Sequence, residues 1–525
     1  MERKLFVREA TGLVKQIGAF DSFAMNFAVL NVGIGVVQLF IFAGVAYPGS
    51  DVILGMTIGL IPVIFWGIAY AFMSIATPRT GGDYVWISRV LGGPVGFMAS
   101  WVGLITLLAI IGINANLLSS FYLAPMLLLL GRLTGSPSLE ALGASIATPQ
   151  MIFVLGFLVI IIVGAIAALG LKYAMGLQRI LLAIGMIGTL AIIALFFASS
   201  TSQFSQLFDA HALQYGLSYQ KAIDEAKNAG FVPAFTLSAT VMTLPYVSLI
   251  YGGFQFNVYA GSETKNVSRT QPIAILGCLL IGWLLFTVLG LGAYHAFGAE
   301  FLGAIGYLAT YDPSKYTLPL VPTLSYFAGI LANNTALTAL IEVSFLAWIL
   351  IIQIPYFVLV PRLMFALAFD RVFPTKIAEV SDKYHTPIIA TLVTIGAAVV
   401  GLYLFTFTTV FALLSNITLA LTIIWFLAGL AAILFPYRRR QIFDNSPALV
   451  RTKVAGVPLL TISGIITAAF MAIATIFAWI PSPLLNNLVI VGLFASGLVL
   501  YFIIRHVQLR RGIDLAYLYK EIPPE

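Results

Sequence analysis

Two apolar stretches of this chain are each long enough to cross a bilayer, and each carries paired glycines near its middle. They cover residues 16–47, with Gly33-Ile34-Gly35, and 234–261, with Tyr251-Gly252-Gly253-Phe254. Glycine weakens a helix by about 1 kcal/mol relative to alanine, so both helices are predicted to break there. Broken backbone within a membrane is tolerated only where it is buried in protein or lines a water-filled cavity. Two such breaks at matching places in two halves of an apolar chain indicate the substrate site of a secondary transporter.

The composition is that of a polytopic membrane protein. Of the 525 residues, 60% are hydrophobic and only 9% are charged, whereas a soluble domain carries about 25% charged residues. The net charge of +7 does not indicate nucleic-acid binding, because the basic residues lie in short loops between apolar stretches. The lipid bilayer is therefore the expected partner. The single cysteine, Cys278, excludes an intramolecular disulfide and a cysteine-rich metal site. The charged residues 1–10 and the length of the first apolar stretch argue against a cleavable signal peptide.

Hydropathy windows of about 20 residues predict an all-α fold with twelve transmembrane helices. Their expected limits are 16–47, 50–76, 93–125, 150–171, 177–199, 234–261, 272–297, 335–369, 387–406, 408–435, 456–480 and 484–505. Only 406–409 is left for a turn between the ninth and tenth helices. In the long segment 200–233, residues 218–227 are predicted to form a short surface helix that ends at Gly230.

The basic residues fix the expected orientation. All but four of the 27 Lys and Arg residues fall in segments that are cytoplasmic if the N-terminus is inside. The exceptions are Arg132, Lys221, Lys227 and Lys315. Because short cytoplasmic loops are enriched in Lys and Arg, both termini are expected in the cytoplasm, in a multi-pass protein of the plasma membrane.

The positions of the two breaks divide the first ten helices into two sets of five. Because five is odd, the second set enters from the opposite face, which makes the repeats inverted. The expected segments are a cytoplasmic N-terminus, the first repeat, an extracellular loop, the second repeat, a cytoplasmic loop, helices eleven and twelve, and a cytoplasmic tail. They cover 1–15, 16–199, 200–233, 234–435, 436–455, 456–505 and 506–525.

Several motifs, in order along residues 11–505, resemble those of the amino acid–polyamine–organocation (APC) superfamily of permeases. They lie in the first break, before the third helix, at the sixth helix and the loop after it, at the end of the eighth helix, and after the tenth. The matching residues are Gly33-Ile34-Gly35; Gly81-Gly82-Asp83-Tyr84 with Arg89, Gly92, Gly96-Phe97 and Trp101; Gly253-Phe254 with Gly261-Ser262-Glu263-Thr264-Lys265-Asn266, Arg269 and Pro272; Arg362 with Ala368-Phe369-Asp370-Arg371 and Phe373-Pro374; and Arg438 to Arg440, Pro447, Arg451 and Gly456-Val457-Pro458. The resemblance implies the five-plus-five inverted-repeat (LeuT-like) fold and transport by alternating access.

The breaks also supply a binding mechanism. A half-helix N-terminus presents free N–H groups and a positive dipole end that favours an anion, so an amino acid carboxylate is expected at the first break. Carbonyls at the second break can accept hydrogen bonds from the α-ammonium group, as the resemblance also implies. The expected substrate-binding residues are Asn31, Gly33, Ile34, Gly35, Leu249, Ile250, Tyr251, Gly252, Gly253, Phe254 and Gln255. The alternative is that these glycines only permit tight helix packing.

Some positions depart from the family pattern. Ile34 stands where the family usually has serine, and Gln255 stands where many members have glutamate. Some proton-coupled relatives carry a lysine in the fifth helix, whereas Gly185 falls near that place here. Tyr251 and Phe254 are candidates for an aromatic lid over the substrate, and the alternative is that they face the core or lipid.

The coupling ion is left open between H⁺ and Na⁺, and no other cofactor or metal is expected. Glu342 is an ionisable residue inside a transmembrane stretch, which is a functional hypothesis by default. It either carries a proton or sits near the outer helix end in water or a hydrogen bond. Asp21 is expected to pair with a basic residue of an inner loop and act as a gate. A sodium site would need hydroxyls of the eighth helix, where Ser344 is the one candidate in the helix interior.

Three other functions are weighed. A membrane-embedded enzyme would need a metal or nucleophile motif, and neither His-Glu-x-x-His, Gly-x-Ser-x-Gly nor a P-loop occurs. A channel would show a continuous polar pore. Polyamines or other organic cations are the main rival substrates, but they would want acidic residues near Gln255 or in the third helix, and 99–130 contains none. Neutral or small apolar amino acids are therefore the expected substrates, and the oligomeric state is left open.

Overall fold

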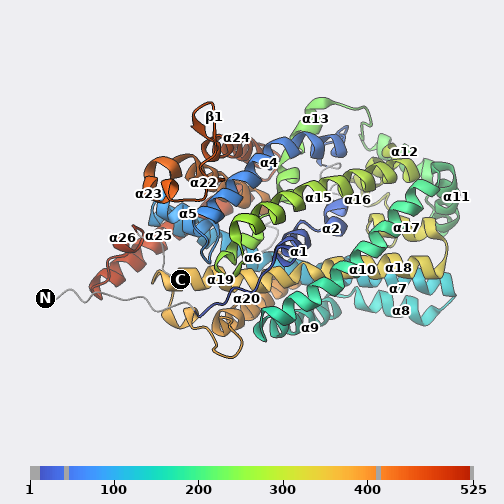
Figure 1. Cartoon of the computed structure of the whole chain (residues 1–525). Helices are drawn as coiled ribbons and strands as arrows, with labels where there is room; N and C mark the ends of the chain where they lie inside the picture. Colours follow the sequence, from blue (N-terminus) through green and yellow to red (C-terminus); the bar gives the residue numbers. More distant parts are fainter. Residues whose placement is uncertain (1–11, 39, 41–45, 410–415, 521–525) are drawn as a thin grey trace.

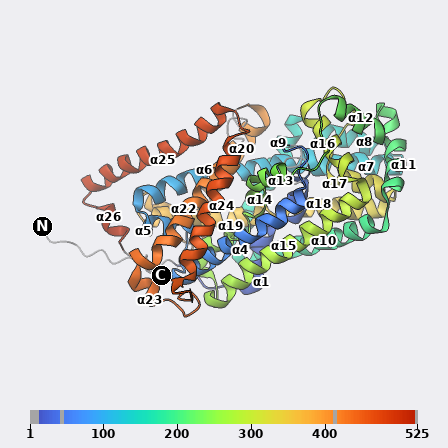
Figure 2. The same ribbon diagram turned by 90° about the horizontal axis from the view of Figure 1, so that it is seen from above.

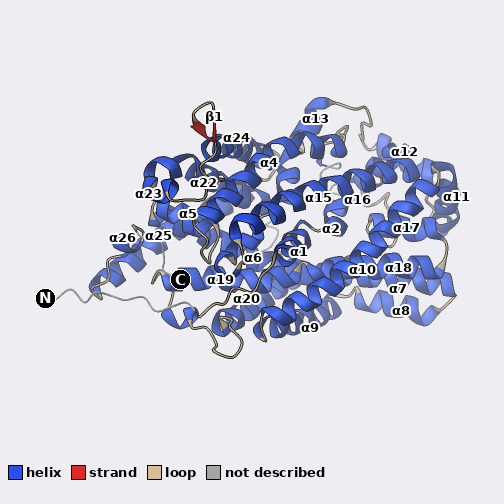
Figure 3. Cartoon of the chain, viewed as in Figure 1, coloured by secondary structure: helices blue, strands red, loops and turns tan. Residues whose placement is uncertain are grey.

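The fold is an all-α bundle, as expected from the sequence. The computed structural model describes residues 12–38, 40, 46–409 and 416–520. Nearly all of the regular structure is helical (Figure 3), apart from a small antiparallel hairpin of β1 (Lys453–Val454) and β2 (Val457–Pro458). Strand β1 lies in the loop 436–455 that was expected to be cytoplasmic, whereas β2 occupies the start of the eleventh predicted helix, 456–480.

Ten apolar helices in the described part of the chain are long enough to cross a membrane. They are α4 (Val52–Ala76), the continuous run of α6 (Gly93–Leu117), η2 (Leu118–Leu123) and α7 (Ala124–Thr134), α9 (Pro149–Ala168), α10 (Leu171–Ala198), α15 (Val267–Phe297), the pair α18 (Thr335–Ile351) and α19 (Gln353–Phe369), α20 (Ile388–Phe407), α22 (Ile417–Arg438), α24 (Leu459–Trp479) and α25 (Leu484–Arg510). The expected total of twelve would also require the two interrupted stretches to cross, and stays a prediction.

The interrupted stretches are built from shorter pieces. The first contains α1 (Ala19–Leu30) and α2 (Val32–Gln38), and the second contains α13 (Leu237–Met242), α14 (Leu244–Tyr251), η4 (Phe256–Tyr259) and η5 (Gly261–Glu263). The tenth predicted helix begins at Ile417 rather than at 408, and the residues 410–415 before it lie outside the described residues.

Short helices outside these stretches cover the two ends of the bundle. They are α5 (Asp83–Val90), α8 (Pro137–Ile146), α11 (Thr201–Ala212), η3 (Leu213–Tyr215), α12 (Tyr219–Asn228), α16 (Ala299–Tyr311), α17 (Leu324–Ala332), η6 (Thr375–Ala378), α23 (Arg440–Asp444) and α26 (Leu515–Leu518). Helix α12 confirms the predicted surface helix: Ser218 caps its first turn and Gly230, with a φ of 100°, follows its end. Helix α11 was not expected, because its sequence lacks a strong apolar period.

Helices α5, α23 and α26 lie at one end of the bundle, and α8, α11 and α12 lie at the opposite end (Figures 1 and 2). We call these the inner end and the outer end, following the orientation expected from the basic residues. Helices α1 and α2 pass through the middle of the bundle between α15, α18 and α10, so that the first break is surrounded by other helices rather than by lipid (Figure 1).

Candidate substrate cavity

The first break lies at Asn31, two residues before the predicted glycines. Helix α1 ends at Leu30, and Asn31 adopts a left-handed conformation with a φ of 51°. Its side chain then starts α2, because Asn31 Oδ1 accepts a hydrogen bond from the amide of Ile34 at 2.9 Å. Asparagine tolerates this conformation better than most residues and also caps helices. The predicted break at Gly33-Ile34-Gly35 was therefore wrong by a few residues, and these three residues form the first turn of α2.

The second break lies where the sequence predicted it. Helix α14 ends at Tyr251, and a turn over residues 252–255 leads into the short helix η4. Within this turn the carbonyls of Leu249 and Tyr251 accept backbone hydrogen bonds from Gly252 and Phe254 at 3.2 and 3.0 Å. A carbonyl oxygen has two lone pairs, so these groups keep acceptor capacity for a ligand. We call residues 31–35 the first break and residues 252–255 the second break.

The two breaks touch each other. A side chain at Gly253 would overlap the backbone of Val29 and Leu30, so only glycine allows the second break to approach the end of α1 this closely. A second contact joins α1 to η4: Asn26 Nδ2 donates to Asn257 Oδ1 at 3.1 Å, and the amide of Asn257 donates to Asn26 Oδ1 at 2.8 Å. These buried bonds join the two interrupted stretches into one structural unit.

A cavity of about 640 Å³ opens beside the two breaks. Its walls come from both interrupted stretches and from α6, α19, α22 and the connection between α24 and α25. The described lining residues include no Asp, Glu, Lys, Arg or His, and most of the lining is aliphatic or aromatic. Cavities of this size, apolar with a few polar groups, are typical of small-molecule sites.

Seven of the eleven expected binding residues line this cavity, and the other four do not. Asn31, Ile34, Gly35, Leu249, Ile250, Gly252 and Gly253 line the cavity. Gly33 does not, because the indole of Trp348 packs directly against it. Gln255 lines a second, smaller cavity, described below.

Tyr251 and Phe254 do not line the cavity, so the expected lid is not formed by these residues. Tyr251 is fully buried and its hydroxyl reaches the carbonyl of Met56 on α4 at 3.4 Å. The ring of Phe254 packs edge-on against Trp66 of α4, with ring centroids 4.6 Å apart. Both side chains therefore take the core-facing alternative, which the helix turn at residues 251–254 imposes by directing them toward α4.

The sequence analysis missed several residues of the cavity wall. Asn114 on α6 is the most informative, because its Nδ2 is buried and has no hydrogen-bond partner among the described residues. Tyr246, Tyr356 and Trp425 add aromatic surface from α14, α19 and α22. A polar residue within an apolar transmembrane stretch is costly and often functional, and this signal could have selected Asn114.

Trp348 fills the space between α1, α2 and α10. Its carbonyl accepts a hydrogen bond from Asn31 Nδ2 at 2.6 Å, and its indole Nε1 donates to Thr189 Oγ1 at 3.0 Å. The ring also packs against Gly185, where a side chain would lie 2.9 Å from the indole. An indole therefore occupies the place at which the family resemblance implies a lysine in some relatives. Ser344, the candidate for a sodium site, instead donates to the carbonyl of Gly185 at 2.8 Å.

Glu342 lies on α18, away from the central cavity. Its side chain is fully buried, and neither carboxyl oxygen has a hydrogen-bond partner among the described residues. Tyr122 of the π-helical turn η2 is the neighbouring titratable group. Glu342 is therefore neither exposed to water nor hydrogen-bonded to a described residue, unlike the second alternative drawn from the sequence.

The inner end of the bundle is closed by ion pairs between separate elements. Glu263 of η5 binds Arg362 of α19 through two hydrogen bonds, at 2.5 and 2.8 Å, and both side chains are buried. Asp21 of α1 accepts two hydrogen bonds from Arg179 of α10, each at 2.8 Å. Asp21 thus has the basic partner that was expected, although Arg179 is largely exposed, and exposed pairs contribute little to stability.

Comparison with known proteins places this architecture in a family. A profile described as amino acid permease matches residues 17–503, nearly the whole chain. The chain belongs to the amino acid permease family. Members of this family are membrane transporters, so the chain is a multi-pass transport protein rather than a member of an enzyme family.

Individual relatives of this permease are distant. A methylthioribose transporter of Bacillus subtilis (strain 168) is 23% identical over 402 residues, covering 75% of this chain and 76% of the relative. The serine/threonine exchanger SteT of the same organism is 24% identical over 398 residues, covering 75% and 77%. The branched-chain amino acid permease BcaP of Lactococcus lactis subsp. cremoris (strain MG1363) is 24% identical over 265 residues, covering 48% and 51%.

Proposed function

We propose that this permease is a secondary active transporter of amino acids with neutral or small apolar side chains. The observation that carries the proposal is the central cavity, which both interrupted stretches line and in which no described residue bears a charged side chain. A zwitterionic amino acid is neutral overall, so its two charges can be met by backbone dipoles. A charged side chain would be desolvated without a partner, which is strongly unfavourable.

The backbone of the two breaks supports a binding mode for the amino acid. We place the carboxylate beside the first break, where α2 begins, with Asn114 Nδ2 as an unpartnered donor in the same cavity. The α-ammonium group then meets the carbonyls at the end of α14, from Leu249 to Tyr251. The side chain faces the apolar wall of α6, α19 and α22, which also includes Trp425.

Two of the relatives have names compatible with this substrate class, a branched-chain amino acid permease and a serine/threonine exchanger, whereas the third is named as a methylthioribose transporter. We propose alternating access in the plasma membrane, with both termini cytoplasmic and with H⁺ symport or exchange. Glu342 is the proposed coupling acid of the outer half, because its side chain is fully buried and neither carboxyl oxygen has a hydrogen-bond partner among the described residues.

The test is transport by purified protein in liposomes. Labelled neutral amino acids are expected to exchange against a preloaded unlabelled pool and to accumulate under an inward H⁺ gradient without Na⁺. The variant Glu342→Gln is expected to retain exchange and to lose accumulation. Exchange of polyamines instead of amino acids would contradict the proposal, and a requirement for Na⁺ would contradict H⁺ coupling.

A further inference from the structure

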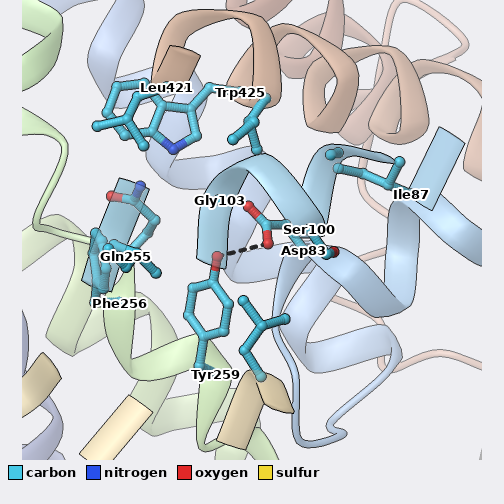
Figure 4. A pocket seen from close by; sticks show the side chains of 13 residues that line it. Asp83, Ile87, Ser100, Gly103, Gln255, Phe256, Tyr259, Leu421 and Trp425 are labelled. Carbon is cyan, nitrogen blue, oxygen red and sulfur yellow. Dashed lines mark hydrogen bonds between the residues drawn. The ribbon is translucent and has the colours of Figure 1, made fainter. Parts of the chain in front are cut away.

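A second cavity lies between the central cavity and the inner end. Its volume is about 20 Å³, and it shares Phe256, Leu421 and Trp425 with the wall of the central cavity. Asp83 and Gln255 line it from opposite sides, and Ser100 lies beside Asp83 (Figure 4). This volume suffices for one water molecule, which needs roughly 10–15 Å³ of such space.

Asp83 begins α5 and is buried without an opposite charge. Its carboxyl accepts hydrogen bonds from the hydroxyl of Tyr259 on η4 at 2.8 Å (Figure 4) and from that of Tyr70 on α4 at 3.1 Å. No ion pair joins it to any described residue. The nearest arginine on its own helix, Arg89, lies 2.6 Å from Asp370, and Tyr84 also donates to Asp370. Burial therefore raises the pKa of the Asp83 carboxyl, and the two tyrosine hydroxyls only partly oppose this shift.

Gln255 supplies the complementary group. Its side chain is 2% exposed, and its Oε1 has no hydrogen-bond donor among the described residues. An unsatisfied buried acceptor costs about 1–3 kcal/mol. Gln255 Oε1 therefore lacks a hydrogen-bond donor, and the carboxyl of Asp83 lines the same cavity. A proton on this carboxyl supplies the donor, either directly or through one water molecule.

We propose that Asp83 is a proton-binding site of the inner half of the transport path, with Gln255 as the group that receives the hydrogen bond of the bound proton. The inference rests on the proposed transport function. The side chains that line the cavity carry five oxygen atoms, two from Asp83 and one each from Ser100, Gln255 and Tyr259. This is fewer than the six to eight that a hard cation such as Ca²⁺ takes, which favours a proton over such a cation.

The partners of Asp83 connect proton binding to opening of the inner end. Tyr70 belongs to the first half of the chain and Tyr259 to the second interrupted stretch, so movement of η4 away from α5 replaces the Tyr259 hydroxyl with water, which also donates hydrogen bonds to the ionised carboxyl. Hydration removes the burial that favours the protonated acid. Asp83 thus binds its proton while the inner end is closed and releases it to the inner side on opening.

The test uses full-length protein in liposomes that contain a pH-sensitive dye, with an inward gradient of a neutral amino acid that the wild type exchanges. We expect wild-type protein to acidify the interior. Asp83→Asn should exchange substrate within about threefold of the wild-type rate but lose at least tenfold of the proton movement. Asp444→Asn, at an exposed acid of α23, is the matched control and should behave as wild type.

A second variant, Tyr259→Phe, tests the inference even if Asp83→Asn does not fold. Tyr259→Phe keeps the carboxyl but removes a hydrogen bond that favours the ionised form, so the pH of half-maximal proton-coupled uptake should rise. Proton movement by Asp83→Asn at the wild-type ratio, or an unchanged pH profile in Tyr259→Phe, would overturn the inference. Loss of a sodium requirement in Asp83→Asn would instead identify a metal-cation site and also overturn it. Absence of amino acid exchange in the wild type would refute the proposed function itself.

Discussion

Asn31 combines three properties at the first break. It adopts a φ of 51°, donates to the carbonyl of Trp348 and accepts from the amide of Ile34. Asn31→Gly loses these side-chain hydrogen bonds and a third, from Nδ2 to the carbonyl of Ala28 at 3.2 Å, but keeps the backbone conformation. Asn31→Ala loses the same bonds and also incurs about 1–2 kcal/mol for the left-handed conformation. We expect both variants to be less stable than wild type, with Ala below Gly, in thermal unfolding of detergent-purified protein. Equal stability of Ala and wild type would contradict this role.

His211 makes stability depend on pH at the outer end. Its Nε2 lies 2.8 Å from the hydroxyl of Tyr326 and 3.3 Å from Arg132 Nη1. Burial, followed by the charge of Arg132, lowers the pKa of His211 from 6.5 to about 4. Between these values the unfolded chain binds a proton that the folded protein does not, so stability falls as the pH drops from 6.5 to 4. His211→Gln should flatten this part of the curve of melting temperature against pH; an unchanged curve would refute the assignment.

The sequence predicted backbone features of the site better than side-chain contacts. Paired glycines located both breaks to within a few residues. Glycine is needed where two backbones approach closely, as Gly253 approaches α1, so it marks such a place in the sequence. The contacts of Trp348 and the directions of Tyr251 and Phe254 depend on neighbouring helices that are distant in sequence. No local pattern specifies which of the many aromatic residues faces a cavity.

At the level of elements, the pair Glu263–Arg362 fastens η5 to α19 across the inner end. Removing one partner of a buried ion pair leaves an uncompensated charge and costs about 3–5 kcal/mol. Glu263→Gln should therefore lower the free energy of unfolding by that amount. The double variant Glu263→Gln/Arg362→Met, which buries no charge, should regain most of it. A double variant as unstable as the single one would show that the pair is not the cause.

Element types followed from periodicity and length, but connections between them did not. The limits of α4 and α24 agree closely with the predicted ones, whereas α10 and α15 begin more than one helical turn earlier than predicted, at Leu171 and Val267. Helices α11, α16 and α17 were unassigned because they are stabilised by contacts with one another and with α15, such as the rings of Phe204, Phe301 and Phe327. Long-range packing of this kind has no signature within a short sequence window.

At the scale of the whole molecule, the large cavity reaches toward the outer end, while buried ion pairs close the inner end. The chain offers a direct assay of this asymmetry, because its single cysteine, Cys278, is fully buried in α15. A membrane-impermeant maleimide should therefore leave the wild type unlabelled, so that an introduced cysteine reports only its own exposure.

Two positions distinguish the sides. Thr418 lines the large cavity near the start of α22, and Ser100 lines the small cavity beside Asp83. In sealed right-side-out vesicles, Thr418→Cys should be labelled from outside and protected by a bound neutral amino acid, whereas Ser100→Cys should not react. In inverted vesicles, Ser100→Cys should react only when substrate drives turnover, because its cavity is closed in the state described here. Labelling of Ser100→Cys from outside would contradict both the orientation and the separation of the two cavities by Phe256, Leu421 and Trp425.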